Sequence, residues 1–388
     1  MNDLLSSVGP EARALLHLCR PEARAGGGAP QVEAVSPFTD DLDWTMLFRL
    51  ACAEQAVGVV QAAIRQFRPT KLPKREQLAF ERLGAVAEFR QGRLAHYIQS
   101  VAEVLADLPF LLIKGASLAL THYGSIDDRP MCDIDLIVPR ADAASANRRM
   151  LDAGWESDPE TAHRLRRHHH LPTLTDPERV GVKLEIHTRL FRRSAPFLLT
   201  EEDVFGRHLR VPGAAGSVPV PSPEDQLLHA CLNFAWSNRL VRNGWVALRD
   251  VNRLAVRELD WTRFAAAARA CLGGSCAYWT LRLSRDLTGT AVPPDVLDRL
   301  ASPASSRWSE MAARHFAGRL FTGVPEALAA MDKLMWALAI RPRTSGRGNA
   351  RPWAPSSGWS HLRRLPGRLR RFGGWARYAR GVFSPSPR

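Results

Sequence analysis

The feature that most constrains the fold is a short run, CDIDLIVP at residues 132–139, in which acidic and aliphatic residues alternate. A period of two is typical of a β-strand with one buried face. The aliphatic side chains then point into a core, while Asp133 and Asp135 share the opposite face with Cα atoms roughly 7 Å apart. Two carboxylates this close repel each other unless that face meets water or they hold a cation together.

A second strand with acidic residues is predicted further along the chain. Residues 168–190, HHHLPTLTDPERVGVKLEIHTRL, indicate two strands around a turn at 176–179. In the later strand Lys183, Glu185 and His187 share one face, and the apolar residues that alternate with them point to the opposite face. If this strand lies beside the first on the same core, Glu185 joins the aspartate pair. Three carboxylates on neighbouring strands suit a pair of Mg²⁺ ions about 3.5–4 Å apart, the arrangement of phosphoryl or nucleotidyl transfer.

A possible phosphate-binding turn precedes the acidic strand. The stretch IKGAS (113–117) closes a short apolar run and opens a helix, whose N-terminus favours anions. Gly115 allows close approach to the backbone, and Lys114 and Ser117 add a charge and a hydroxyl toward a triphosphate. Arg129, in the loop before the acidic strand, is a further candidate for a phosphate contact. The alternatives are an ordinary strand-to-helix turn and a surface arginine.

The periodicity of the apolar residues divides the chain into four parts. Residues 1–107 are predicted to form an N-terminal helical region, 108–215 a core with the order strand, helix, strand, helix and hairpin, and 216–340 a C-terminal helical domain. Ser222 is the expected cap of the first C-terminal helix, and further helical segments are expected around 245–258, 261–271, 276–287 and 310–340. The fold class is therefore α+β, a small mixed β-sheet core flanked by helical regions on both sides.

The positive charge is concentrated at the C-terminus. The net charge is +14, but twelve arginines and no acidic residue lie in 341–388, which leaves +2 for the rest. A nearly neutral body argues against a nucleic-acid groove across the whole protein. The tail is predicted to be disordered or only partly helical. Its interleaved arginine and aromatic residues suit weak contact with RNA or an anionic membrane surface, with a solvated basic tail as the alternative.

The compartment is predicted to be cytoplasmic. The first twenty residues lack the basic leader and apolar stretch of a secretory signal, and no long apolar run spans a membrane. The six cysteines are scattered and form no pair spaced for zinc. Cys132 is expected to be a small buried residue.

Weaker candidates lie on the C-terminal helices. Asp225, His229 and Asn233 follow at steps of four residues and share one helix face, which either lines the cleft or is solvated. Arg249 and Asp250 are similar candidates on the next helix. Four tryptophans are expected in the helical core rather than as stacking platforms for bases, namely Trp236, Trp245, Trp261 and Trp279.

Taken together, the motifs LLIKGASLAL, RPMCDIDLIV and VKLEIHTRL resemble the nucleotidyltransferases of the polymerase-β-like superfamily, and more narrowly an uncharacterised bacterial branch. The resemblance covers roughly residues 108–255. It implies that Asp133 and Asp135 bind metal and that Glu185 is the third carboxylate, which binds one metal and activates the acceptor hydroxyl. It also implies that Gly115 and Ser117 hold nucleotide phosphates, although Ala116 separates two residues that are usually adjacent.

The expected function is Mg²⁺-dependent transfer of an NMP from an NTP, ATP included, to an acceptor hydroxyl or phosphate. Two Mg²⁺ ions are expected, and the acceptor is a small molecule, a peptide or a protein. One alternative is a catalytically degenerate nucleotide-binding module with a regulatory role. The other is an RNA- or membrane-surface protein that acts through residues 341–388.

Overall fold

The computed structural model describes seven stretches of the chain, namely residues 3–20, 35–157, 170–213, 216–256, 259–301, 303–321 and 329–340. The predicted basic tail, 341–388, and the histidines His168 and His169 lie outside these residues.

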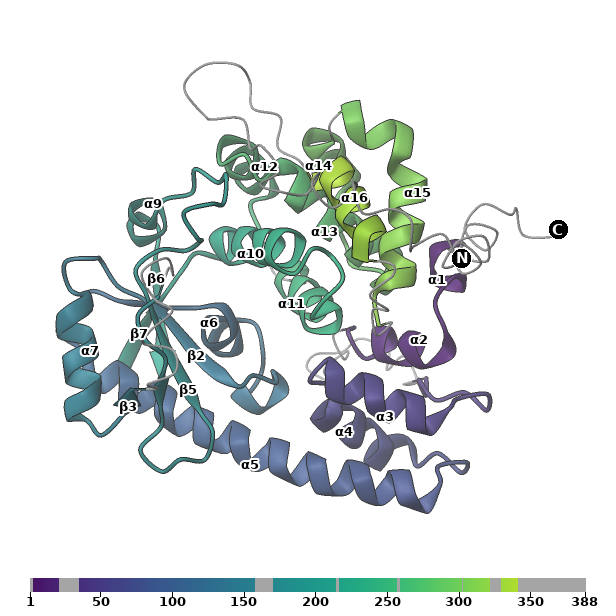
Figure 1. The fold of residues 1–388 in the computed structure, drawn as a ribbon, viewed down its shortest axis with the longest axis horizontal. Helices are drawn as coiled ribbons and strands as arrows, with labels where there is room; N and C mark the ends of the chain where they lie inside the picture. The colour runs from purple at the N-terminus through teal and green to yellow at the C-terminus, as the bar shows by residue number, and fades with distance from the viewer. Residues whose placement is uncertain are drawn as a thin grey trace, which may run out of the picture.

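Helices make up most of the described chain, and the strands are short (Figure 1). The N-terminal helices are α1 (Asp3–Ser6), α2 (Pro10–His17), α3 (Trp44–Ala53), α4 (Val57–Phe67) and the long α5 (Lys74–Val104). The central elements are β1 (Leu111–Ile113), α6 (Lys114–Thr121), η1 (Ile126–Asp128), β2 (Asp133–Ile137), α7 (Ala143–Asp152), β3 (Glu156–Ser157), β4 (Leu174–Thr175), β5 (Lys183–His187), α9 (Glu201–Gly206), β6 (Leu209–Gly213) and β7 (Gly216–Val220). The C-terminal helices are α10 (Pro223–Leu232), η3 (Asn233–Ser237), α11 (Gly244–Ala255), α12 (Trp261–Ala270), α13 (Gly274–Thr288), α14 (Pro294–Leu300), α15 (Pro303–Arg319) and α16 (Ala329–Ile340).

The central sheet has the strand order β1-β2-β5-β4-β3. Its middle pair, β2 and β5, is parallel, whereas every other neighbouring pair is antiparallel. The predicted turn between β4 and β5 is present, since the N–H of Arg179 donates to the carbonyl of Asp176 at 3.0 Å. The structure is thus an α+β fold with a small mixed sheet, as predicted.

The alternation along β2 separates a packed face from a polar face. Ile134 and Leu136 are fully buried in a core shared with α5, α6 and α7. On the other face Ile137 packs with a small apolar cluster that includes Val204 of α9. Asp133 and Asp135 precede Ile137 on that same face. The strand therefore presents its two carboxylates beside apolar packing rather than to open water.

Local sequence signals explain where α9 and α10 begin. Thr200 and Asp203 form a capping box at the start of α9. Ser222 caps α10 as predicted, because its side chain accepts from the N–H of Asp225, and Pro223 fits the first turn. Asp142 stands at the N-cap position of α7, but its side chain makes no capping hydrogen bond there.

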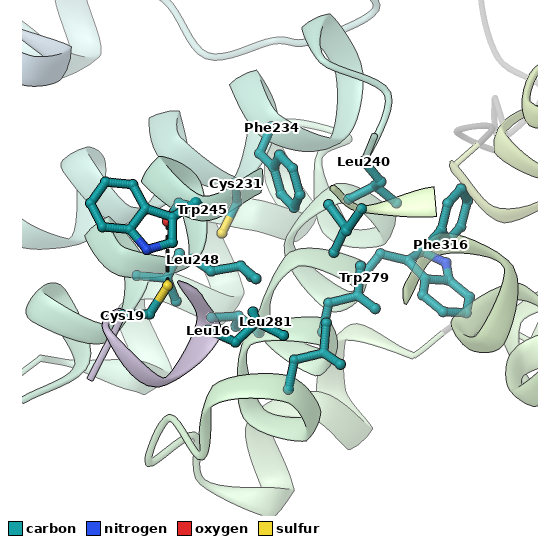
Figure 2. Close-up of a cluster of buried hydrophobic side chains, with 14 of the residues drawn as sticks. Leu16, Cys19, Cys231, Phe234, Leu240, Trp245, Leu248, Trp279, Leu281 and Phe316 are labelled. Carbon is teal, nitrogen blue, oxygen red and sulfur yellow. Dashed lines mark hydrogen bonds between the residues drawn. The ribbon is translucent and has the colours of Figure 1, made fainter. Parts of the chain in front are cut away.

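The largest apolar cluster joins the two ends of the chain. Figure 2 shows Leu16 and Cys19, from α2 and the turn after it, packed among side chains of the C-terminal helices such as Trp245 and Leu281. The indole Nε1 of Trp245 donates to the carbonyl of Leu15 at 2.8 Å. The sheet has a second, separate core. The tryptophans behave as predicted: Trp245 and Trp279 are fully buried, and Trp236 and Trp261 pack partly buried against the cluster.

The fold contains elements that the sequence analysis did not predict, among them β3 and α9. The hairpin of β6 and β7 was not predicted, because Pro212 and Pro219 interrupt its strand pattern. Helix α14 was missed, and the helical segment predicted over 310–340 is described as two helices, α15 and α16. The division into domains stays a prediction.

None of the helices in the described part of the chain is both long enough and apolar enough to cross a membrane.

Candidate active site

The parallel pairing of β2 and β5 aligns the acidic residues of the two strands. Asp135 lies opposite Glu185 in the register, and Ile137 lies opposite His187. Side chains at paired positions of neighbouring strands point to the same face. The prediction that the later strand brings its glutamate beside the aspartate pair is therefore confirmed.

Asp135 is the centre of a compact polar cluster. Its Oδ1 accepts from Nζ of Lys114 at 2.6 Å and lies 2.7 Å from Nε2 of His187. The same imidazole nitrogen lies 3.4 Å from Oε2 of Glu185. Asp135 and His187 are both buried, and Glu185 is partly exposed. The Lys114 ammonium, two carboxyl groups and one imidazole thus lie together in a largely buried space.

The surroundings shift the pKa values of the carboxyl groups on this face in opposite directions. Burial and the negative charge of Asp135 raise the pKa of Asp133 from 3.8 to about 6. Burial alone would also raise the pKa of Asp135, but the Lys114 ammonium and the His187 hydrogen bond hold it well below its usual range. The hydrogen bond from His187 lowers the pKa of Glu185. The charges of Lys114 and Arg129 offset the rise in the pKa of Asp133 only in part.

The donor set fits a divalent metal. Asp135, Glu185 and His187 each offer a ligand atom, and these atoms lie within 4.8 Å of one another. Asp133 lies on the same face with a raised pKa, as expected for a carboxylate that a nearby cation would stabilise. The predicted ligands were Asp133, Asp135 and Glu185, and the structure adds His187 to them. Oxygen ligands suit Mg²⁺, and the imidazole widens the choice toward Mn²⁺.

The predicted phosphate turn begins α6 directly after β1. Lys114 has a left-handed backbone conformation, with φ of 50°, and this sharp turn directs its ammonium to Asp135. A Cβ at Gly115 would collide with Nη1 of Arg129, so a larger residue would force this ion-paired side chain to shift. The hydroxyl of Ser117 donates to the carbonyl of Lys114 at 3.0 Å and is buried. Lys114 therefore reaches the cluster, Gly115 packs against Arg129, and Ser117 stabilises the turn.

Arg129 lies in a buried ion pair rather than on the surface. Its Nε and Nη2 donate to the two oxygens of Asp250 on α11, at 3.0 and 2.8 Å. The hydroxyl of Tyr123 also donates to Asp250, at 2.7 Å. The surface alternative for this arginine is wrong, and Asp250 has a clear role in holding it. The remaining nitrogen, Nη1, lies beside Gly115 and donates to the carbonyl of Pro130 at 3.4 Å.

Helix α10 closes the other side of the cluster. A cavity of about 60 Å³ lies between α6 and α10, and Lys114, Ser117, His229 and Asn233 contribute to its lining. Burial and the charge of Lys114 lower the pKa of His229 to about 3, so this imidazole is neutral at physiological pH. Asp225 does not join the cavity, because Arg207 binds both of its oxygens at 2.9 Å. The solvated-face alternative for this stripe is wrong, since Asp225 and His229 are buried.

Two residues gain importance from the structure. His187 shares the face of Glu185 in the strand pattern, so the signal for it was present in the sequence although it was not singled out. Cys132 was expected to be buried, but it is partly exposed between Gln55 and Arg90. It lies one residue before β2, outside the regular alternation of the strand.

The comparisons with known proteins agree with this geometry. A family model described as an uncharacterised nucleotidyltransferase matches residues 40–289, more than half of the chain. The chain belongs to this nucleotidyltransferase family. The match extends from the N-terminal helices across the sheet to α13. No curated protein and no solved structure matches the chain. The wider relation to the polymerase-β-like superfamily stays a prediction.

Proposed function

We propose that this nucleotidyltransferase moves an NMP from an NTP to an acceptor hydroxyl or phosphate with the help of Mg²⁺. The observation that carries the proposal is the in-register pair of Asp135 and Glu185, with Asp133 on the same face. Asp133, Asp135 and Glu185 would hold two metal ions, joined by the imidazole of His187. When bound, the ions would neutralise the charge that develops on the phosphate oxygens.

The chain's own residues divide the remaining work. Lys114 and the α6 turn at Gly115 are placed to hold the triphosphate, with Nη1 of Arg129 as a further donor. Ser117, predicted as a phosphate ligand, would act by holding the carbonyl of Lys114 in place. Because Lys114 is bound to Asp135, nucleotide and metal would compete with that ion pair and release the ammonium toward the phosphates.

The reaction proposed is a single displacement at the α-phosphorus. The acceptor oxygen forms a bond to the α-phosphorus as the bond from that phosphorus to the bridging oxygen breaks, and pyrophosphate leaves with the bond electrons. The proton of an acceptor hydroxyl passes to Glu185 and from there to water. The low pKa of Glu185 means that it is ionised and ready to accept this proton at physiological pH. An acceptor phosphate is already anionic and needs no base.

The first experiment measures thermal unfolding with and without Mg²⁺ and each NTP. Binding at 100 times the dissociation constant adds about 2.7 kcal/mol to stability. The shift is expected in the wild type, at reduced size in the Glu185→Gln variant, which loses one charged metal ligand, and not in an Asp133→Ala/Asp135→Ala double variant. Asp298→Ala, at an exposed position of α14, is the matched control.

The outcomes separate an enzyme from a binding module. Transfer of a labelled NMP in the wild type that falls at least about a hundredfold in Glu185→Gln supports the base role. A Mg²⁺-dependent shift without transfer to any acceptor would point to the degenerate regulatory module. Absence of any nucleotide-dependent shift would refute the proposed function.

A further inference from the structure

The small cavity between α6 and α10 contains polar side chains to which the proposed function gives no role. Its volume is about 60 Å³, and α6 and α10 are in contact around it (Figure 1). Lining residues of each helix are three or four residues apart and so share a face, with Lys114 and Ser117 on α6 and His229 and Asn233 on the α10 side. Lys114 also binds Asp135, so the cavity and the carboxylate cluster share a wall.

His229 is a buried polar side chain that faces this cavity. It is 8% exposed, and its ring packs edge-to-face against Phe191 with 5.3 Å between the ring centroids. That contact fixes the orientation of the imidazole. The two ring nitrogens make no hydrogen bond within the described residues, and neither is sealed off from the cavity that the side chain lines. A buried imidazole without a hydrogen-bond partner calls for a bound ligand or water.

Asn233 adds a second unused polar group at the C-cap position of α10. Its carboxamide is partly exposed and has no hydrogen bond to another residue in the described part of the chain. The helix widens at this residue, because the N–H of Asn238 donates to the carbonyl of Asn233 at 3.0 Å and so closes the π-helical turn η3. Such turns are rare and are frequent at functional sites. The distortion therefore coincides with a residue that lines the cavity.

The charge and size of the cavity suit a single phosphate group. Lys114 and Arg129 supply positive charge to its lining. Asp250 also lines it, but both carboxylate oxygens accept from Arg129, at 3.0 and 2.8 Å, so this negative charge is compensated. A volume of about 60 Å³ holds roughly two water molecules. Pockets for drug-sized ligands are several times larger, so a nucleobase or a sugar ring does not fit.

The cavity lies where the end of a bound triphosphate would arrive. The charges of Lys114 and Asp135 both influence the pKa of His229, which places this imidazole close to the carboxylate cluster. In the proposed reaction the α-phosphorus lies at metal ions held by the carboxylates, and the other two phosphates extend from there past Lys114. Because Lys114 contacts Asp135 and also lines the cavity, the chain of phosphates is directed toward α10.

We infer that His229 and Asn233 bind the terminal phosphate of the NTP, and that this contact selects triphosphates over diphosphates and monophosphates. The inference rests on the proposed function and names residues that hold its leaving group. His229 is neutral at physiological pH, so the imidazole and the Asn233 carboxamide offer N–H donors without a further charge beside Lys114. Pyrophosphate then leaves from the α10 side of the site.

The affinities of a nucleotide series test the inference without a measurement of transfer. The ligands are the NTP that gives the largest thermal shift, its diphosphate and monophosphate, and pyrophosphate, each titrated with Mg²⁺ by isothermal calorimetry. Asn233→Asp keeps the shape of the side chain and places a negative charge at the cavity. The matched control is Asn238→Asp, which makes the same change at a partly exposed position outside the cavity. His229→Leu removes both ring nitrogens, and His229→Gln keeps an N–H donor.

In the wild type the triphosphate is expected to bind at least about tenfold more tightly than the diphosphate, as one hydrogen bond to a charged group implies. Asn233→Asp and His229→Leu should each weaken triphosphate and pyrophosphate binding at least about tenfold, and change monophosphate binding less than about threefold. Asn238→Asp should leave every affinity within about threefold. His229→Gln should recover most of the loss. Because ligands are compared within one variant, a general loss of stability does not imitate this result.

Equal weakening of triphosphate and monophosphate binding would overturn the inference, because it would place the two residues at the sugar, the base or the metal ions. Unchanged affinities in both variants would overturn it too, as would a wild type that binds diphosphate and triphosphate equally. In each of these cases Mg²⁺-dependent binding of the triphosphate would leave the proposed function standing. A wild type that binds no nucleotide with Mg²⁺ would refute the proposed function and the inference together. The two failures are therefore distinguishable.

Discussion

Replacing Asp133 with asparagine removes a charge that its surroundings make unfavourable. In the metal-free protein the pKa of Asp133 is about 6, raised from 3.8 by burial and by the charge of Asp135. At about 1.4 kcal/mol per pH unit, ionising this carboxyl in the folded protein costs about 3 kcal/mol relative to the unfolded chain. The asparagine amide would keep the shape of the neutral carboxyl without that cost. The variant should therefore be more stable than the wild type at neutral pH without metal.

The pH dependence follows from the sign of the shift. A carboxyl with a raised pKa in the folded protein contributes stability that is fully present below pH 3.8 and is lost as the pH rises through about 6. The gain in unfolding free energy from Asp133→Asn is expected to be about 3 kcal/mol at pH 7.5 and about 1 kcal/mol at pH 4.5. The other carboxyl groups are common to both proteins, so the difference reports the charge of Asp133 together with its interactions with Asp135 and Glu185.

The assay is urea unfolding in EDTA across this pH range, repeated with excess Mg²⁺. In Mg²⁺ the wild type should gain more stability than the variant, which keeps Asp135, Glu185 and His187 but lacks one carboxylate, so the advantage of the variant should shrink. Asp298→Asn should change stability by less than about 0.5 kcal/mol at every pH. A variant that is equally or less stable than the wild type in EDTA at pH 7.5 would refute the reasoning, as would a gain that does not depend on pH.

Three further outcomes follow from packing around the site. Gly115→Ala should lower NTP affinity at least about tenfold in a thermal-shift titration, because its Cβ would displace Arg129, and unchanged affinity would contradict that contact. Asp250→Leu should cost about 3–5 kcal/mol in urea unfolding, since it leaves the Arg129 guanidinium buried without its partner, and adding Arg129→Met should recover most of the loss. Ser222→Ala should cost about 1 kcal/mol through the lost cap of α10, and a cost that Ser222→Thr fails to reduce would show that the hydroxyl is not its cause.

The strands of the site could be predicted because their chemistry is local. Alternation fixes which side chains share a face, and a buried face fixes the register, so Asp133, Asp135 and Glu185 could be grouped from the sequence alone. Gly115 could be chosen because it stands between an apolar run and a helical pattern. These inferences depend only on neighbours within a few residues.

The rest depended on pairing across long stretches of chain. Asp250 meets Arg129 across 121 residues, and no local pattern marks either as the partner of the other. The cavity between α4 and α5 arises where the two helices pack, and no pattern within either helix predicts it. The hairpin of β6 and β7 was hidden because its prolines replace the usual alternation. A sequence pattern shows which side chains share one face of a helix or strand. Only the packing of the folded chain decides which of these faces contact each other.

The bond between Trp245 and Leu15 has a consequence for the synthesis of the protein. It spans 230 residues, and α2 lies beside helices made much later, as the purple and green ribbons of Figure 1 show. On the ribosome the first helices emerge long before α11 and α13. The apolar faces of the first helices therefore remain exposed until α11 and α13 have been made. Folding of this end is therefore slow and offers a binding surface to chaperones. A chain released before α13 is made would contain the complete strands β2 and β5. Its largest apolar cluster would lack the side chains that α13 and the later helices contribute.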